Sequence, residues 1–188
     1  IILVIAWLLW VPLALAILRN PREDVLTGIL YHSTRLYCLY FQRAKATGQE
    51  NVPNSRTPGP LIVIANHTAG VDPILVQAFM PFEPRWMMGR DMMAPGLNPL
   101  WEFLGIIGVS RDGSDMTSAK EAIKHLKAGG VVGIFPEGGI ETPAKTLRPF
   151  MPGIGLVIAR SGAPVLPAFI RGTPDSPSTF GSFSMRGN

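Results

Sequence analysis

A histidine followed five residues later by an aspartate is the pair in this sequence best suited to acid–base chemistry. His67 and Asp72 form this His-x4-Asp motif, in the stretch that follows the apolar run Leu61–Ala65. An ionised carboxylate that is hydrogen-bonded to one imidazole nitrogen fixes the tautomer and leaves the other nitrogen free as a base. The spacing therefore predicts a base steered by a carboxylate. Taken alone, the pair could equally be a loop histidine and a helix cap.

The elements around this pair are expected to be a strand and a helix. Leu61–Ala65 has the length of a buried strand. Asp72 is a preferred N-cap and Pro73 fits the first helical position, which predicts a helix that continues towards Met80. His67 would then lie on a strand-to-helix loop, where α/β folds place reactive groups. Asp72 would lie at the positive end of the helix, which favours its ionised form.

Further polar residues and glycines follow other apolar runs. They are Arg111, after the run 105–110, and Glu137, Gly138 and Gly139, after the run Val131–Phe135. In a parallel sheet the carboxyl ends of the strands share one edge, so these groups would face the crevice that contains His67. Arginine suits phosphate, glutamate can accept a hydrogen bond from a hydroxyl, and the glycines could offer N–H groups to an anion. Singly, each could also be a solvated turn or an exposed loop residue.

Apolar runs alternate with helical patterns along the rest of the chain. Strands are expected at 61–65, 85–89, 105–110, 131–135 and 164–170, and helices from 72, within 92–104, from 114 or 115 to 128, and at 150–161. This alternation predicts an α/β fold with a largely parallel central sheet flanked by helices. The segment 92–104 contains apolar residues that are expected to be exposed, among them Met92, Met93 and Trp101. They could line an acyl-chain groove or belong to the core.

The N-terminal region predicts a membrane-associated helical segment. Ile1–Leu18 is uninterrupted apolar sequence, about 27 Å long as a helix and just short of the ~30 Å hydrocarbon core. A signal peptide lacks support, because no basic region and no cleavage site of small residues is present; a buried core helix is a second alternative. Arg19 and Arg22 follow at once, which places this end and the next domain on the cytoplasmic side of the cell membrane. The apolar residues of 23–41 fall on one face of a predicted amphipathic helix, which suits a membrane interface or packing on the domain.

Composition limits the classes of protein and partner. The 188 residues suit one globular domain and contain 17 Lys and Arg against 13 Asp and Glu, a formal charge of +4. This mild, scattered excess suits an anionic membrane or a phosphorylated substrate and predicts no nucleic-acid partner. The single Cys38 excludes an internal disulfide, and the three histidines lack metal-ligand spacing, so no metal is expected. We expect residues 1–46 to be membrane-associated helices and 47–188 to be the α/β domain, in a fragment truncated at its C-terminus.

Four stretches of this sequence resemble, in order and spacing, the motifs of the glycerolipid acyltransferases. They are Asn66–Asp72, Gly105–Arg111, Phe135–Gly138 and Pro164–Pro167, and the likeness covers roughly Gly48 to Thr173. The greatest likeness is to the 1-acyl-glycerol-3-phosphate acyltransferases of the PlsC-like branch. Two membrane-associated N-terminal helices, as in some members, would agree with residues 1–41.

The resemblance implies an enzyme of phospholipid synthesis that transfers a fatty acyl group to a lysophosphatidate hydroxyl at the membrane. It implies that acyl-CoA or acyl-carrier protein is the donor, with no other cofactor, and that a lysophospholipid and membrane lipids are the partners. By the same match, His67 is the general base and Asp72 its orienting partner. Arg111 would contact the acceptor phosphate, and Glu137 with Gly138 and Gly139 would contact the acceptor.

The sequence also departs from the pattern of this family. The third motif usually continues with Thr-Arg-Ser, where this chain has Gly139, Ile140 and Glu141. Arg148 or Lys145 could replace the missing cation, and Arg90 could replace a lysine that often precedes the second motif; Met151 stands where a lysine is common. These changes leave open another lysolipid, an aminoacyl or a glycolipid acceptor. A non-catalytic lipid-binding module and a hydrolase that activates water are the competing functions.

Overall fold

The computed structural model describes residues 2–110, 116–140, 147–176 and 178–187. Within these ranges the chain forms a five-stranded, wholly parallel sheet in the order β3-β2-β4-β1-β5. The strands are β1 (Leu61–Ala65), β2 (Arg85–Gly89), β3 (Ile107–Val109), β4 (Val131–Ile134) and β5 (Val165–Ala168). The predicted α/β class and parallel sheet are confirmed.

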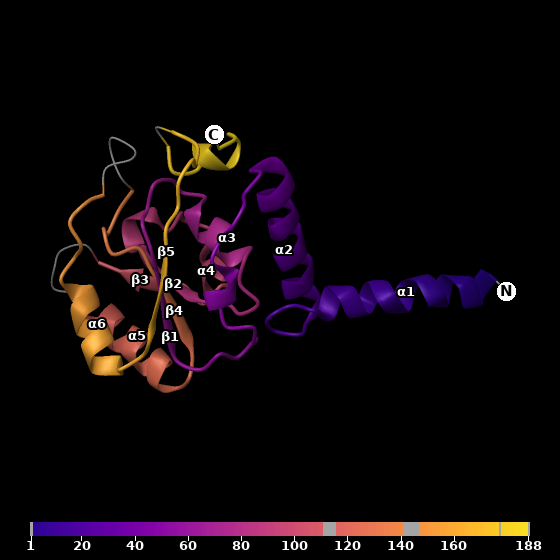
Figure 1. Ribbon diagram of the computed structural model, residues 1–188, viewed down its shortest axis with the longest axis horizontal. Coiled ribbons are helices and arrows are strands. Elements are labelled where there is room, and N and C mark those ends of the chain that lie inside the picture. Colours follow the sequence, from indigo (N-terminus) through magenta and orange to yellow (C-terminus); the bar gives the residue numbers. More distant parts are fainter. Residues whose placement is uncertain (1, 111–115, 141–146, 177, 188) are drawn as a thin grey trace.

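The helices cover both faces of this sheet, and Figure 1 shows α5 and α6 on one side and α2, α3 and α4 towards the other. The α-helices are α1 (Ile2–Leu18), α2 (Val25–Leu36), α3 (Asp72–Gln77), α4 (Asn98–Phe103), α5 (Met116–Lys127) and α6 (Gly153–Ser161). Short 3-10 helices lie at Gln49–Asn51, Arg90–Met92 and Gly181–Phe183, and a π-helical turn at Tyr37–Phe41 continues α2.

Strand β1 divides the core because successive side chains of a strand point to opposite faces. Leu61, Val63 and Ala65 join the cluster that contains Val76 of α3. Ile62 joins the cluster formed with Val132 of β4 and residues of α5 and α6. With both faces covered, β1 is an almost continuous apolar run, as expected for a strand in the middle of a parallel sheet.

The segment 92–104 contributes to the core at one position where the sequence suggested exposure. Trp101 of α4 is only 8% exposed, so its expected exposure was wrong, whereas Leu97 and Leu100 are exposed. Phe103 stacks under the guanidinium of Arg22, 4.6 Å from the ring centroid. Packing within the protein therefore explains the apolar character of Trp101 and Phe103 in this segment.

Helix α1 extends away from the body of the protein, as Figure 1 shows. Trp7, Leu8, Trp10, Leu13 and Leu15 all have exposed side chains on it. Across the described residues, no helix combines the length and the apolar character that a membrane crossing requires. Helix α2 packs against both α1 and α3.

The tyrosines of the second N-terminal segment differ in their surroundings. Tyr31 donates a hydrogen bond to the carbonyl of Met80 (3.0 Å) and Tyr37 donates one to the carbonyl of Phe183 (2.7 Å). Tyr40 is 75% exposed. Packing on the domain therefore explains Tyr31 and Tyr37, and Tyr40 is the one of the three free to face an interface.

Cys38 is a buried packing residue beside α3. Its side chain is fully buried, and its thiol lies 3.4 Å from the carbonyl oxygen of Ile74. Burial raises the pKa of the Cys38 thiol to about 12. We expect Cys38 of the folded protein to resist iodoacetamide at pH ~8, because the thiolate is the reactive form, and to react rapidly after denaturation in urea. Mass spectrometry measures the difference, and rapid labelling of the folded chain would contradict it.

Candidate active site

The imidazole of His67 and the carboxylate of Asp72 are in direct contact. Nδ1 of His67 lies 3.0 Å from Oδ2 of Asp72. An ionised carboxylate can only accept hydrogen bonds, so Nδ1 carries the hydrogen. Among the described residues, Nδ1 is the imidazole nitrogen that is bonded, which leaves Nε2 for a substrate. The predicted pairing of the two residues is confirmed.

The carboxylate of Asp72 turns back into the loop. Its Oδ2 also accepts the backbone N–H groups of Thr68 (2.6 Å) and Ala69 (2.8 Å), and its side chain is completely buried. The N-cap of α3 is Val71, with no side-chain cap, and the helix ends at Gln77. The predicted helix start at Asp72 is confirmed, but the predicted N-cap role of Asp72 was wrong: the carboxylate that could have capped the helix organises the loop.

An aromatic stack fixes the plane of the His67 ring. The ring lies on Phe135 with the centroids 4.2 Å apart, and Phe135 stacks on Trp86 at 5.0 Å. Trp86 fits across the sheet because Gly133 of β4 has no side chain; a Cβ there would lie 2.4 Å from the indole ring. The His67 side chain remains 17% exposed, so the ring is supported from below and still reaches solvent.

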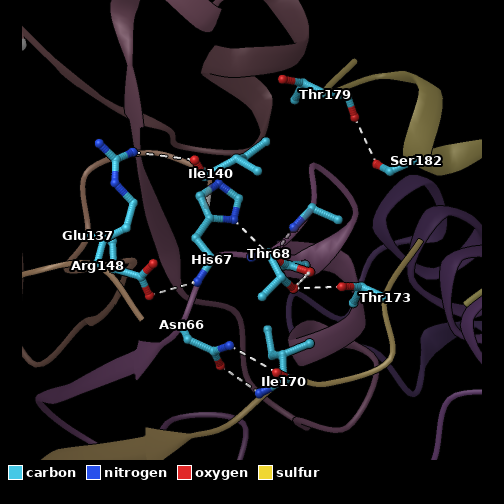
Figure 2. Close-up of polar contacts among 12 residues, drawn as sticks. Asn66, His67, Thr68, Glu137, Ile140, Arg148, Ile170, Thr173, Thr179 and Ser182 are labelled. Atoms are coloured by element: carbon cyan, nitrogen blue, oxygen red, sulfur yellow. Dashed lines mark hydrogen bonds and ion pairs between the residues drawn. The ribbon is translucent and has the colours of Figure 1, made fainter. Parts of the chain in front are cut away.

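The register of β1 and β4 brings Glu137 to His67. Each residue of β1 pairs with the residue 70 positions later in β4, and the same offset continues beyond the strands, where the His67 N–H donates to Oε1 of Glu137 (3.1 Å). Glu137 is 4% exposed, and its Oε2 has no hydrogen-bond partner among the described residues. Figure 2 shows the two residues side by side at the ends of their strands. The predicted proximity of His67 and Glu137 is confirmed.

The glycines after Glu137 form a tight turn. Gly138 has a φ of 68°, in the left-handed region that favours glycine, and its N–H donates to the carbonyl of Phe135. A Cβ on Gly138 would lie 3.0 Å from Met151, and one on Gly139 would lie 3.4 Å from the guanidinium of Arg148. Arg148 also donates to the carbonyl of Ile140 (3.4 Å), as Figure 2 shows. The turn therefore places an exposed cation beside the predicted acceptor site.

With this geometry established, similarity to known proteins decides the family. The family model described as Acyltransferase matches residues 43–171. The chain belongs to the acyltransferase family. The predicted resemblance is thereby confirmed, over a range that includes β1–β5, His67, Asp72 and Glu137.

Individual members of the acyltransferase family show how far this similarity extends. The chain is 30% identical over 133 residues to the 1-acyl-sn-glycerol-3-phosphate acyltransferase of Borreliella burgdorferi, across 68% of this chain and 50% of that protein. It is 31% identical over 137 residues to the N-acylphosphatidylethanolamine synthase of Arabidopsis thaliana, across 65% of this chain and 48% of that protein. The chain thus spans about half the length of these curated relatives.

A solved structure supports the acyltransferase fold. The crystal structure of the 1-acyl-sn-glycerophosphate (LPA) acyltransferase PlsC from Thermotoga maritima superposes with a TM-score of 0.60 at 23% identity. The match covers 78% of this chain and 59% of that one. The two chains share a fold.

Of three further cations predicted to contact the acceptor, the structure describes one, Arg90. Arg111 and Lys145 lie outside the described residues. Arg90 follows β2 directly, and its side chain lies over Gly108 of β3, where an added Cβ would be 3.4 Å from its Cζ. In the described part of the chain, no cluster of three or more His, Cys, Asp or Glu side chains could hold a metal ion.

Sequence reasoning missed the role of two polar side chains beside His67. The amide of Asn66 accepts the N–H of Ile170 (2.7 Å) and donates to its carbonyl (2.9 Å), which ties the end of β1 to the chain after β5. Thr68 contacts the hydroxyl of Thr173 at 2.6 Å. An amide directly after a buried strand could have signalled the first contact, because its donor and its acceptor can bond the backbone C=O and N–H groups of the neighbouring strand. No local signal indicates the second.

Proposed function

We propose that this chain catalyses transfer of a fatty acyl group from acyl-CoA or acyl-carrier protein to the free hydroxyl of a lysophospholipid. The first candidate acceptor is 1-acyl-glycerol-3-phosphate, the substrate class in the name of the Borreliella relative. The observation that carries the proposal is the His67–Asp72 contact of 3.0 Å, with the imidazole accessible and Glu137 beside it.

The proposed mechanism is direct attack of the acceptor alcohol on the thioester. Nε2 of His67 removes the hydroxyl proton while the acceptor oxygen bonds to the thioester carbonyl carbon. Asp72 holds the imidazole in the required tautomer and stabilises the imidazolium. As the tetrahedral intermediate collapses, the carbon–sulfur bond breaks and the imidazolium returns the proton to the leaving thiolate. This reaction requires neither an acyl-enzyme intermediate nor a further reactant.

Glu137 supports the choice of an alcohol over water. Its Oε2 is buried without a hydrogen-bond partner among the described residues, and an unpaired buried acceptor costs free energy that a substrate hydroxyl could recover. The acceptor hydroxyl could donate to it on entering the site, before His67 takes its proton, with Gly138 and Gly139 allowing close approach. A water molecule alone would leave the exposed Arg148 beside this turn without a role.

The acceptor could also be an amine, and one comparison favours testing it. The Arabidopsis relative is named an N-acylphosphatidylethanolamine synthase and is as similar as the Borreliella protein. A primary amine becomes nucleophilic in the same way, by loss of a proton to the base. Phosphatidylethanolamine therefore belongs among the acceptors tested.

We further propose that α1 and α2 bind the cell membrane from the cytoplasmic side. Exposed side chains of Trp7 and Trp10 on α1, and of Leu26 and Ile29 on α2, give both helices apolar surface that water does not favour. Arg19 is exposed between the helices and suits anionic headgroups. Sedimentation with vesicles of anionic phospholipid tests this; full recovery in the supernatant would contradict it.

Thiol release from acyl-CoA, measured with a chromogenic disulfide, tests the proposed reaction. We expect release only when an acceptor is present, in a panel that includes lysophosphatidate, lysophosphatidylcholine and phosphatidylethanolamine. Release without any acceptor would instead identify a hydrolase. Absence of release with every acceptor and with acyl-carrier protein donors, despite binding of lysolipid, would identify a non-catalytic lipid-binding module.

Arg148 is expected to recognise the acceptor phosphate. Replacing it with alanine should raise the KM for lysophosphatidate about 10-fold with little change in kcat, the effect of one hydrogen bond to a charged group. Arg160 to alanine is the matched control, because this arginine is exposed on α6. Initial rates over a range of acceptor concentrations measure the effect, and equal KM values for both variants would remove Arg148 from this role.

A further inference from the structure

A pair of threonine hydroxyls connects the His67 loop to the chain that follows β5. Oγ1 of Thr68 lies 2.6 Å from Oγ1 of Thr173, and 3.5 Å from each carboxylate oxygen of Asp72. Figure 2 shows Thr173 reaching Thr68 from outside the loop. Thr173, 105 positions after Thr68, is thus linked through the Thr68 hydroxyl to the carboxylate of Asp72.

We propose that Thr68 and Thr173 are positioning residues that hold Asp72 against His67. This inference rests on the proposed acyl transfer. It adds a part of the chain beyond the Asn66–Asp72 motif to the machinery that sets the orientation of the base.

The hydrogen-bond roles of the two hydroxyls follow from the carboxylate. Oδ2 of Asp72 already accepts from the ring of His67 and from two backbone N–H groups. Any further contact to this ionised carboxylate must come from a donor, so the hydroxyl of Thr68 directs its hydrogen there. Thr68 then accepts from Thr173 at 2.6 Å. Without Thr173 the Thr68 hydroxyl could rotate, and one support of the carboxylate would weaken.

Thr173 can position another residue because the backbone on which it lies is itself packed. A Cβ added to Gly187 would lie 2.4 Å from the carbonyl oxygen of Gly172 and 3.7 Å from Cα of Thr173. The N–H of Gly187 donates to Oε1 of Gln42, and Nε2 of Gln42 donates to the carbonyl of Met185 (2.9 Å). Gln42 lies at the end of the π-helical turn, so the N-terminal helical segment supports the position of Thr173.

The same C-terminal segment also contacts the His67 loop at Gly70. A Cβ on Gly70 would lie 2.1 Å from the carbonyl oxygen of Thr179, a distance no side chain could accept without movement of the backbone. Two separate contacts, at Thr68 and at Gly70, therefore fix the loop from one side. The strand β1 and Glu137 hold its other side.

The test compares Thr173→Val with Thr173→Ser in the thiol-release assay. Valine has the shape of threonine without the hydroxyl, so we expect kcat to fall about tenfold, the effect of one ordinary hydrogen bond, with KM unchanged. Serine restores the hydroxyl and should restore most of kcat. Thr57→Val is the matched control, because Thr57 is exposed in the loop before β1. Thermal unfolding of each variant verifies that it is folded.

A second measurement separates positioning from simple stabilisation. In an Asp72→Asn background the Thr173→Val change should have no further effect on kcat, because the residue it supports is already lost. An equal fall in both backgrounds, or wild-type kcat in Thr173→Val, would overturn the inference. If replacement of His67 with alanine leaves full activity, the proposed function fails as well; if that variant is inactive while Thr173→Val keeps wild-type kcat, only this inference fails.

Discussion

Replacing His67 with alanine is expected to lower kcat for acyl transfer by a factor of about 10²–10⁴, the usual contribution of a general base. The alanine variant cannot take the proton of the acceptor hydroxyl, while the Asp72 loop and helices α1 and α2 remain. Thiol release from acyl-CoA with saturating acceptor measures the loss, and vesicle sedimentation should show unchanged membrane binding.

Two further variants identify the cause of that loss. His67→Phe keeps an aromatic ring that can stack on Phe135, at the 4.2 Å contact seen for the imidazole, but has no nitrogen. It should be as inactive as the alanine variant. His125→Gln is the control, because His125 packs against Gly130 and not against the His67 loop. Burial, and to a lesser extent the charge of Arg85, lowers the pKa of His125. Activity above a tenth of wild type in either His67 variant would exclude this histidine as the base.

Replacing Asp72 with asparagine should lower kcat by a similar factor, about 10²–10⁴, with a smaller change in KM. The amide has the same shape, and its oxygen can take the place of Oδ2, on which three donors now converge. The amide oxygen is neutral, however, so it holds the imidazole N–H more weakly and no longer stabilises the imidazolium. Because Asp72 is completely buried, we also expect a loss of about 1.5–3 kcal/mol in the free energy of unfolding.

Asp24→Asn is the matched control for a carboxylate-to-amide change. Asp24 caps α2 by accepting the N–H of Thr27 at 2.8 Å, and asparagine is an equally good N-cap. Its activity and its unfolding free energy should stay close to wild type. The comparison uses urea unfolding together with the thiol-release assay. Wild-type kcat in Asp72→Asn would show that the aspartate is only a structural residue of the loop.

The parts of the fold that the sequence predicts well depend on local signals. The apolar run that forms β1 coincides with the observed strand, because a strand buried on both faces needs no polar residues. The meeting of His67 with Glu137 also follows, since parallel strands carry their following loops to one edge. What this rule cannot supply is the strand order, which depends on packing between segments far apart in the sequence.

The errors share one physical cause, which is competition between local and distant partners. Asp72 has the residue type and position of an N-cap. Its Oδ2 instead accepts two loop N–H groups and the imidazole, and no side chain caps the helix. For residues 23–41 the sequence left a membrane interface and packing on the domain both open. At Tyr31 and Tyr37, distant backbone carbonyls of Met80 and Phe183 accept the hydroxyls, which is packing on the domain. Thr173 gave no sign of its role, because a lone threonine in a loop carries no periodicity.

The constant pairing of β1 with β4 has a consequence for how this chain can be re-engineered. The connection from β1 to β4 contains β2, β3 and the His67 loop, so only residues added to its exposed loops would leave the pairing unchanged. One residue inserted within β4, by contrast, would reverse the direction of every side chain after it and carry the carboxylate of Glu137 away from His67. Chimeras built from relatives should therefore exchange exposed loops and keep the length of each strand.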